Sequence, residues 1–172
     1  LTHEFKTAHG RTVRDGGGIT PDVTIEGHDY SRLTYSLVYS GIIQEYALDY
    51  VREHADADED FHLADKDWDG FVAFAKTKEF DYRSSARTYF DRMKKELEKD
   101  GLSKNMSAEL DALQKALEMD KETFLKLKKD EIVPFIEEEI AVRYHFQEAG
   151  IKIRLRYDEQ LKKALASPMI EL

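Results

Sequence analysis

A change of hydrophobic period near residue 31 is the feature that most restricts how this chain folds. After Ser31, apolar residues recur at the spacing of amphipathic helices, beginning with Leu33, Leu37, Ile43, Ala47 and Val51. The first thirty residues lack such a stripe and consist of short runs rich in β-branched and aromatic residues. We therefore predict a closing β segment over residues 1–30 and a separate helical domain over residues 31–172.

The N-terminal segment predicts a hairpin. The runs LTHEFKT and RTVRD flank a short AHG stretch, which favours two paired strands joined by a turn. The run PDVTIEG, residues 21–27, is expected to add a third short strand.

Capping residues and breakers divide the helical region. Ser84 or Ser85 is expected to cap a helix that ends at Asp100–Gly101, with Tyr89, Phe90, Met93 and Leu97 on one face. Ser107 and Asp120 are expected to begin the next two segments. Trp68 precedes a shorter helix that contains Phe71, Phe74 and Ala75.

The last part of the chain predicts one long helix and a short ending. Leu125, Ile132, Ile136, Ile140 and Tyr144 line a helix that is expected to end at Gly150 and to be kinked or divided at Pro134. The alternating run IKIRLR, residues 151–156, predicts a short strand, and Asp158 to about Ala166 a last helix. The predicted fold class is mainly α, an irregular bundle of five to seven helices with a small N-terminal hairpin-like element.

Composition excludes several function classes. The net charge of −9 argues against a nucleic-acid partner, and the absence of cysteine excludes disulfides and thiolate chemistry. The most apolar window, Leu33 to Val51, is interrupted by polar and charged residues, so no transmembrane segment is expected in this chain. The chain begins at Leu1 rather than methionine and shows no signal peptide, so we expect an excised part of a longer protein.

The glycine run Gly16–Gly18 is a poor phosphate-binding loop. Such a loop needs a helix N-terminus directly after it, whereas Ile19, Thr20 and Pro21 follow here and no lysine occupies the Walker position. A turn whose backbone requires positive φ angles is the preferred interpretation.

The run DKDWDG, residues 65–70, begins like a calcium-binding EF-hand loop. Asp65, Asp67 and Asp69 occupy the first, third and fifth positions, but Lys76 replaces the glutamate that closes the site at the twelfth. A free-standing calcium-binding helical protein is therefore a weak alternative. The competing interpretation is a solvated acidic loop in which Asp67 or Asp69 caps a helix and Trp68 packs inward.

The remaining polar residues assign no catalytic, cofactor-binding or metal-binding site, and no cofactor is expected. His3 and His9 are spaced too far apart for a zincin motif, and His145 and Glu148 share a helical face without a third ligand. Glu139 is expected to pair with Arg143 four residues later. No G-x-S-x-G elbow or S-x-x-K motif is present.

The segment FKTAHGRTVRDGGGITPDV, residues 5–23, resembles the end of the protease domain in carboxyl-terminal processing (tail-specific) serine proteases, peptidase family S41. The residues that match its pattern, aromatic-x-T, G-R-x-[IVL] and G-I-x-P-D-[VI], are Thr7, Gly10, Arg11, Val13, Gly18, Ile19, Pro21, Asp22 and Val23. Ala8 departs from it, because proline is common there. The stretches at 137–150 and 157–165 are similar to the helical tails of such proteases.

This resemblance implies a serine nucleophile, a lysine general base and a PDZ domain, all upstream of the matched segment. Lys6 occupies a position that is usually aromatic and is not that lysine. We therefore expect this chain to be inactive and its parent to be a serine-type peptidase of the periplasm or cell envelope. Its implied partners are the missing protease and PDZ domains, a second copy, and the protein or peptide substrates of the parent.

Two interpretations of the helical region follow. In the first, it is a non-catalytic domain that packs on the protease domain or mediates oligomer or partner contacts. In the second, it is a binding module for a substrate or an adaptor. A large exposed apolar groove would favour the second, whereas apolar surface continuous with the β segment would favour the first.

Overall fold

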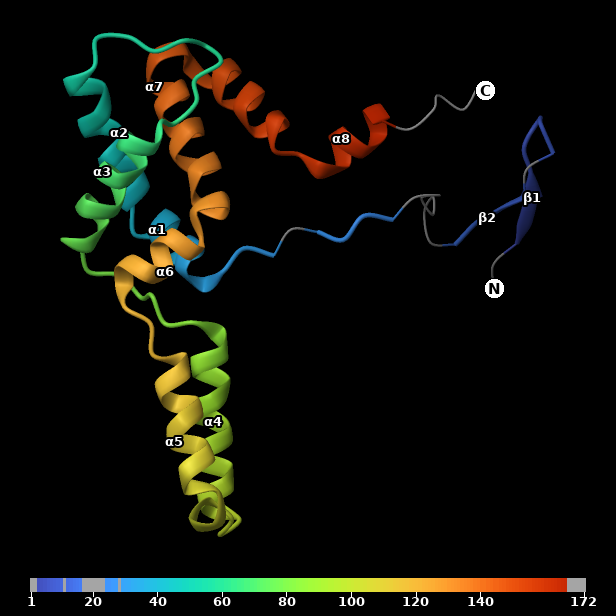
Figure 1. Cartoon of the computed structure of the whole chain (residues 1–172). Helices are drawn as coiled ribbons and strands as arrows, with labels where there is room; N and C mark the ends of the chain where they lie inside the picture. The colour runs from blue at the N-terminus through green and yellow to red at the C-terminus, as the bar shows by residue number, and fades with distance from the viewer. Residues whose placement is uncertain (1–2, 11, 17–23, 28, 167–172) are drawn as a thin grey trace.

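The computed structural model describes residues 3–10, 12–16, 24–27 and 29–166 (Figure 1). Its strands are β1 (Glu4–Lys6) and β2 (Thr12–Arg14). Its helices are α1 (Arg32–Tyr39), α2 (Ile42–Glu53), α3 (Asp65–Lys76), α4 (Ser85–Lys99), the 3-10 turn η1 (Ser103–Met106), α5 (Ser107–Leu117), α6 (Lys121–Leu127), α7 (Lys129–Arg156) and α8 (Glu159–Ala166). The predicted class, mainly α with a small N-terminal hairpin, is confirmed.

The N-terminal hairpin has the predicted form. β1 and β2 pair antiparallel with Phe5 opposite Val13, and Gly10 makes the turn at φ 79°. Gly16 also has a positive φ, of 92°, as predicted for the first glycine of the run. Gly17–Val23 and Arg11 lie outside the described residues. Residues 24–27 are not a strand, so no third strand is seen in the part that is described.

The hydrophobic stripes read from the sequence form the core of the helical body. α2 packs along α7, and α1 and α3 pack against α2. The largest fully buried apolar side chains are Leu33, Leu37, Ile43, Phe71, Leu125, Ile132, Ile136, Ile140 and Ile153. None of the described helices combines the length and the apolar character that a membrane span requires.

Local stop signals explain most helix boundaries. The Ser84 side chain caps α4 by accepting from the Arg87 amide, and Asp120 caps α6 by accepting from the Thr123 amide, both as predicted. Gly101, at φ 73°, ends α4 after Asp100. The first helical stripe is split by Gly41, at φ 77°, into α1 and α2, which brings the described α-helices to eight, one above the expected range.

α7 differs from the prediction at three points. It continues through Gly150 to Arg156, so the predicted end at Gly150 and the predicted strand over residues 151–156 are both wrong. Its division lies at His145 and Phe146 rather than at Pro134, because only the first two have non-helical backbone angles. One kinked helix is therefore found where the sequence predicts a helix followed by a strand.

Close packing explains why Gly150 is inside the helix. The two halves of α7 fold together after the kink, and Ala149 and Ile153 are buried against Ala141. A Cβ atom at position 150 would collide with the Val142 side chain. The glycine therefore permits close approach of the two halves and does not end the helix.

α4 and α5 form an antiparallel arm that projects from the helical body (Figure 1). Their main contacts are with each other and with η1 at the tip. Only Phe90 and Leu110 are buried between the two helices. The arm thus has a small core of its own.

Candidate functional site

The run DKDWDG is the beginning of α3 and not a loop. Asp65 pairs with Lys129 at 2.6 Å, and Asp67 accepts a hydrogen bond from Tyr50 at 3.5 Å. Trp68 is buried, as predicted, but Ala64 is the residue at the helix cap, so the prediction of a cap by Asp67 or Asp69 is wrong. The EF-hand geometry is therefore absent from this segment.

His3 and His145 also lie in structural contacts. His3 pairs with Asp15 across the hairpin, and His145 makes a 2.6 Å hydrogen bond from Nε2 to the Ala57 carbonyl. The kink separates His145 from Glu148, so the predicted shared helical face does not exist. Within the described ranges, no group of three or more His, Cys, Asp or Glu residues could hold a metal ion.

The pair Glu139–Arg143 forms as predicted, at 2.5 Å. Arg143 also donates to the Gln44 carbonyl at 3.1 Å, which ties α7 to α2. The Glu139–Arg143 pair therefore contributes to the packing of α7 on α2.

A buried carboxylate, Glu137, joins three segments that are distant in sequence. Its side chain is only 2% exposed. It accepts hydrogen bonds from the Leu63 amide at 2.8 Å, Arg156 at 3.0 Å and the Tyr157 hydroxyl at 2.8 Å. Burial raises the pKa of Tyr157 to about 12, with the Glu137 carboxylate adding to the effect. Because each oxygen has donors, the buried charge is well compensated.

The same part of α7 makes hydrogen bonds and ion pairs with residues 54–64, which connect α2 to α3. Tyr144 donates to the His54 carbonyl at 2.7 Å, and Arg156 donates to the Phe61 carbonyl at 2.9 Å. Lys152 pairs with Glu59 at 3.1 Å, and Arg156 also pairs with Asp60. We call this connection the clasped loop. The only sequence signal for the clasped loop is the position of Glu137 beside the apolar stripe of α7.

An aromatic surface, which we call the tyrosine face, consists of Tyr30, Tyr35, Tyr39 and Phe135. The Tyr30 ring lies 5.0 Å from Phe135 and 6.0 Å from Tyr35, both edge to face, and the Tyr35 and Tyr39 rings stack at 6.1 Å. Tyr39 is 83% exposed and Tyr35 43%. Exposed, stacked tyrosines present apolar area together with a hydrogen-bonding group, which is typical of protein interfaces. These residues were not among those predicted from the sequence to form a site.

The surface of α3 and α6 contains an open hollow lined by charged side chains. Lys76 and Lys126 both pair with Glu122 there. Because these charges are already paired and few apolar side chains line the hollow, its chemistry does not resemble a peptide-binding groove.

Comparison with known families identifies the helical region. The family described as "Probable PDZ-protease, C-terminal helical domain" matches residues 33–167. A search of curated proteins found no match, and a search of solved structures found none either. The match extends from α1 through α8 and confirms that the helical region is associated with a protease. This chain belongs to the family of C-terminal helical domains of probable PDZ-proteases.

Proposed function

We propose that the helical domain is a non-catalytic part of a tail-specific serine protease of family S41 and packs on its protease domain through the tyrosine face. The proposed parent carries its serine nucleophile and lysine base upstream of residue 5 and acts on protein or peptide tails in the periplasm or cell envelope. The family match supports the protease association. The S41 assignment is supported by the sequence pattern of residues 5–23.

The observation that carries the docking proposal is the exposure of Tyr35 and Tyr39 next to the point where the N-terminal segment enters α1. Tyr30, the residue two before α1, is already part of the tyrosine face through its contact with Phe135. The aromatic surface therefore begins seven residues after the segment similar to the protease domain, at the point where the chain enters the helical domain. Apolar surface continuous with that segment is what a docked domain requires.

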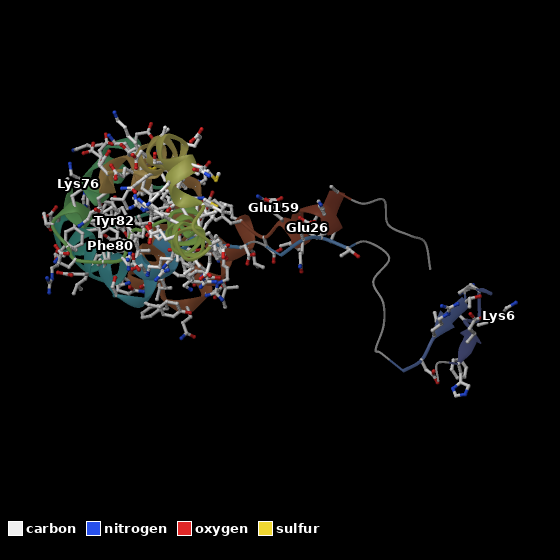
Figure 2. All side chains as sticks on the ribbon, turned by 90° about the horizontal axis from the view of Figure 1, so that it is seen from below. Lys6, Glu26, Lys76, Phe80, Tyr82 and Glu159 are labelled. Carbon is white, nitrogen blue, oxygen red and sulfur yellow. The ribbon has the colours of Figure 1, made fainter. Side chains whose placement is uncertain are left out.

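The positions of two segments, one near each end of the chain, support the same docking proposal. Residues around Glu26 and α8, with Glu159 at its start, extend to the same side of the helical body in two perpendicular views (Figures 1 and 2). α8 buries none of its residues, and Leu165 is 78% exposed. A protease domain on that side would contact both segments.

The test compares substitutions of two exposed side chains in the full-length protease, one inside and one outside the tyrosine face. Tyr39→Asp is expected to release the helical domain, because it places a charge in the proposed interface. Leu127→Asp is the matched control, because Leu127 is 64% exposed and is the last residue of α6, as Tyr39 is of α1. Hydrogen exchange of residues 24–39 and thermal unfolding report the outcome, and the released domain is expected to exchange faster and to unfold in a separate transition.

The 172-residue chain completes the test. There Tyr39→Asp is expected to leave stability unchanged, because the side chain is exposed, and a peptidase assay is expected to show no turnover. Equal effects of Tyr39→Asp and Leu127→Asp in the full-length protein would contradict the docking proposal. Cleavage by the short chain that persists through further purification would contradict the assignment as a non-catalytic domain.

A further inference from the structure

The arm formed by α4 and α5 has one polar and one apolar side. Lys94 and Gln114 follow the buried residues Phe90 and Leu110 by four positions, and they are hydrogen-bonded to each other at 3.0 Å. Arg87 pairs on this side with Asp91 and Glu118. The polar side is therefore closed by bonds within the arm.

The opposite side is apolar and open. Met93 and Leu113 follow Phe90 and Leu110 by three positions, and in two antiparallel right-handed helices such positions fall on one side of the pair. Tyr89 and Met106 extend the same surface. We call these four residues the arm face; Tyr89 is 65% exposed and Leu113 44%.

The arm lacks the packing that two short helices need. α5 has 11 residues, and isolated helices below about 12 to 15 residues are marginal in water. Two antiparallel helices with one open apolar side have the geometry of half a four-helix bundle. A second pair of helices on the arm face would complete the core around Met93 and Leu113.

Charge favours another copy of this chain as the second pair. Residues 85–117 contain seven Lys and Arg and six Asp and Glu, a net charge of +1, whereas the chain carries −9, so two arms approach with little repulsion. Arg92 borders the arm face on α4 and Glu109 borders it on α5. Both are exposed and without a partner in the described part of the chain. When α4 of one copy lies on α5 of the other, these two edges face each other with opposite charge.

We propose that the arm face is a homodimer interface in which α4 of each copy packs on α5 of the other. The two-fold arrangement is self-complementary, so Arg92 of each copy faces Glu109 of the other and the same pair forms twice. It involves α4 and α5 and not the tyrosine face, so it does not rest on the proposed docking to the protease domain.

The main test measures the oligomeric state of the 172-residue chain by sedimentation over a range of concentrations. The chain is expected to dimerise reversibly, and Leu113→Glu to raise the dissociation constant by at least about tenfold. Leu155→Glu is the matched control, because Leu155 is 45% exposed on α7, far from the arm in sequence. Circular dichroism verifies that both variants stay helical.

A charge exchange tests the orientation. Arg92→Glu and Glu109→Arg are each expected to weaken the dimer about 2- to 30-fold, since two exposed pairs are affected, and the combined variant is expected to recover the original affinity. A chain that stays monomeric at all attainable concentrations overturns the proposal, as does a dimer more sensitive to Leu155→Glu than to Leu113→Glu. Failure of the combined variant to recover overturns the α4-on-α5 arrangement.

Discussion

Glu131 is the residue that joins the beginning of α1 to α7. Its carboxylate accepts from the Ser31 amide at 2.7 Å, the Thr34 hydroxyl at 3.0 Å and the Lys128 ammonium at 2.6 Å. Burial by itself raises the pKa of Glu131, but the hydrogen bonds from Lys128, Ser31 and Thr34 outweigh it and lower the pKa to about 2. The ionised form is therefore favoured by folding.

This lowered pKa predicts acid sensitivity. Because the folded-state pKa lies below the value of 4.5 for an unperturbed glutamate, the stabilisation is present above about pH 5 and is lost as the pH falls towards 2. Between about pH 7 and pH 3, wild type is expected to lose up to about 2 kcal/mol more than Glu131→Gln. Urea unfolding at both pH values measures the difference.

Glu79→Gln is the control for this measurement. Glu79 is exposed after α3 and makes no ion pair or hydrogen bond within the described ranges. Its substitution is expected to keep the wild-type pH dependence. Equal pH dependence of the Glu131→Gln variant and wild type would show that the carboxylate contributes nothing to stability.

The kink in α7 depends on one strained residue. Phe146 has φ 63° and ψ −170°, a backbone conformation that is nearly exclusive to glycine and costs about 1 to 3 kcal/mol in other residues. Its ring is 80% exposed and so gains little from burial. The contacts of Glu137 with Arg156 and Tyr157 hold the two halves of the helix together in spite of this cost.

Phe146→Gly is expected to stabilise the domain by about 1 kcal/mol. Glycine adopts the observed backbone angles freely, but part of the gain is offset by its greater freedom in the unfolded chain. Phe146→Ala is the control, because it removes the exposed ring and keeps the strain, so its effect is expected to be near zero. Thermal and urea unfolding compare the three proteins. A glycine variant less stable than the alanine variant would refute strain at this position.

The elements show which structural features a sequence reveals. Ser84, Asp120 and Gly101 act through neighbouring residues, so their helix boundaries were predictable. Gly150 was misread because its role depends on Val142, which reaches it only after the helix has folded back. The kink at Phe146 has no local signal, since its cause is a set of contacts between distant segments. The tyrosine face was missed for a related reason: the stacking of Tyr35 on Tyr39 is local, but their exposure depends on the whole fold.

Glu137 connects the clasped loop to both halves of α7. Glu137→Leu is expected to destabilise the domain by about 3 kcal/mol, because Arg156, Tyr157 and the Leu63 amide lose a shared buried acceptor. Hydrogen exchange at the Leu63 amide is expected to accelerate by more than in the body of α2. Urea unfolding measures the loss of stability.

Glu148→Leu is the matched control for that loss. Glu148 lies on the same helix with an exposed side chain and, among the residues that the structure describes, pairs only with Lys152. Its effect is expected to stay within about 0.5 kcal/mol. If the two leucine variants were equally stable, the buried carboxylate would not connect the loop to α7.

The clasped loop also has a consequence for biosynthesis. The contact between Phe61 and Arg156 spans 95 positions, and that between Leu63 and Glu137 spans 74. A chain emerging from the ribosome therefore presents the loop long before the residues that fix it, and contacts of such sequence separation form slowly. The clasped loop therefore stays without the Arg156 contact until the final turn of α7 has been translated.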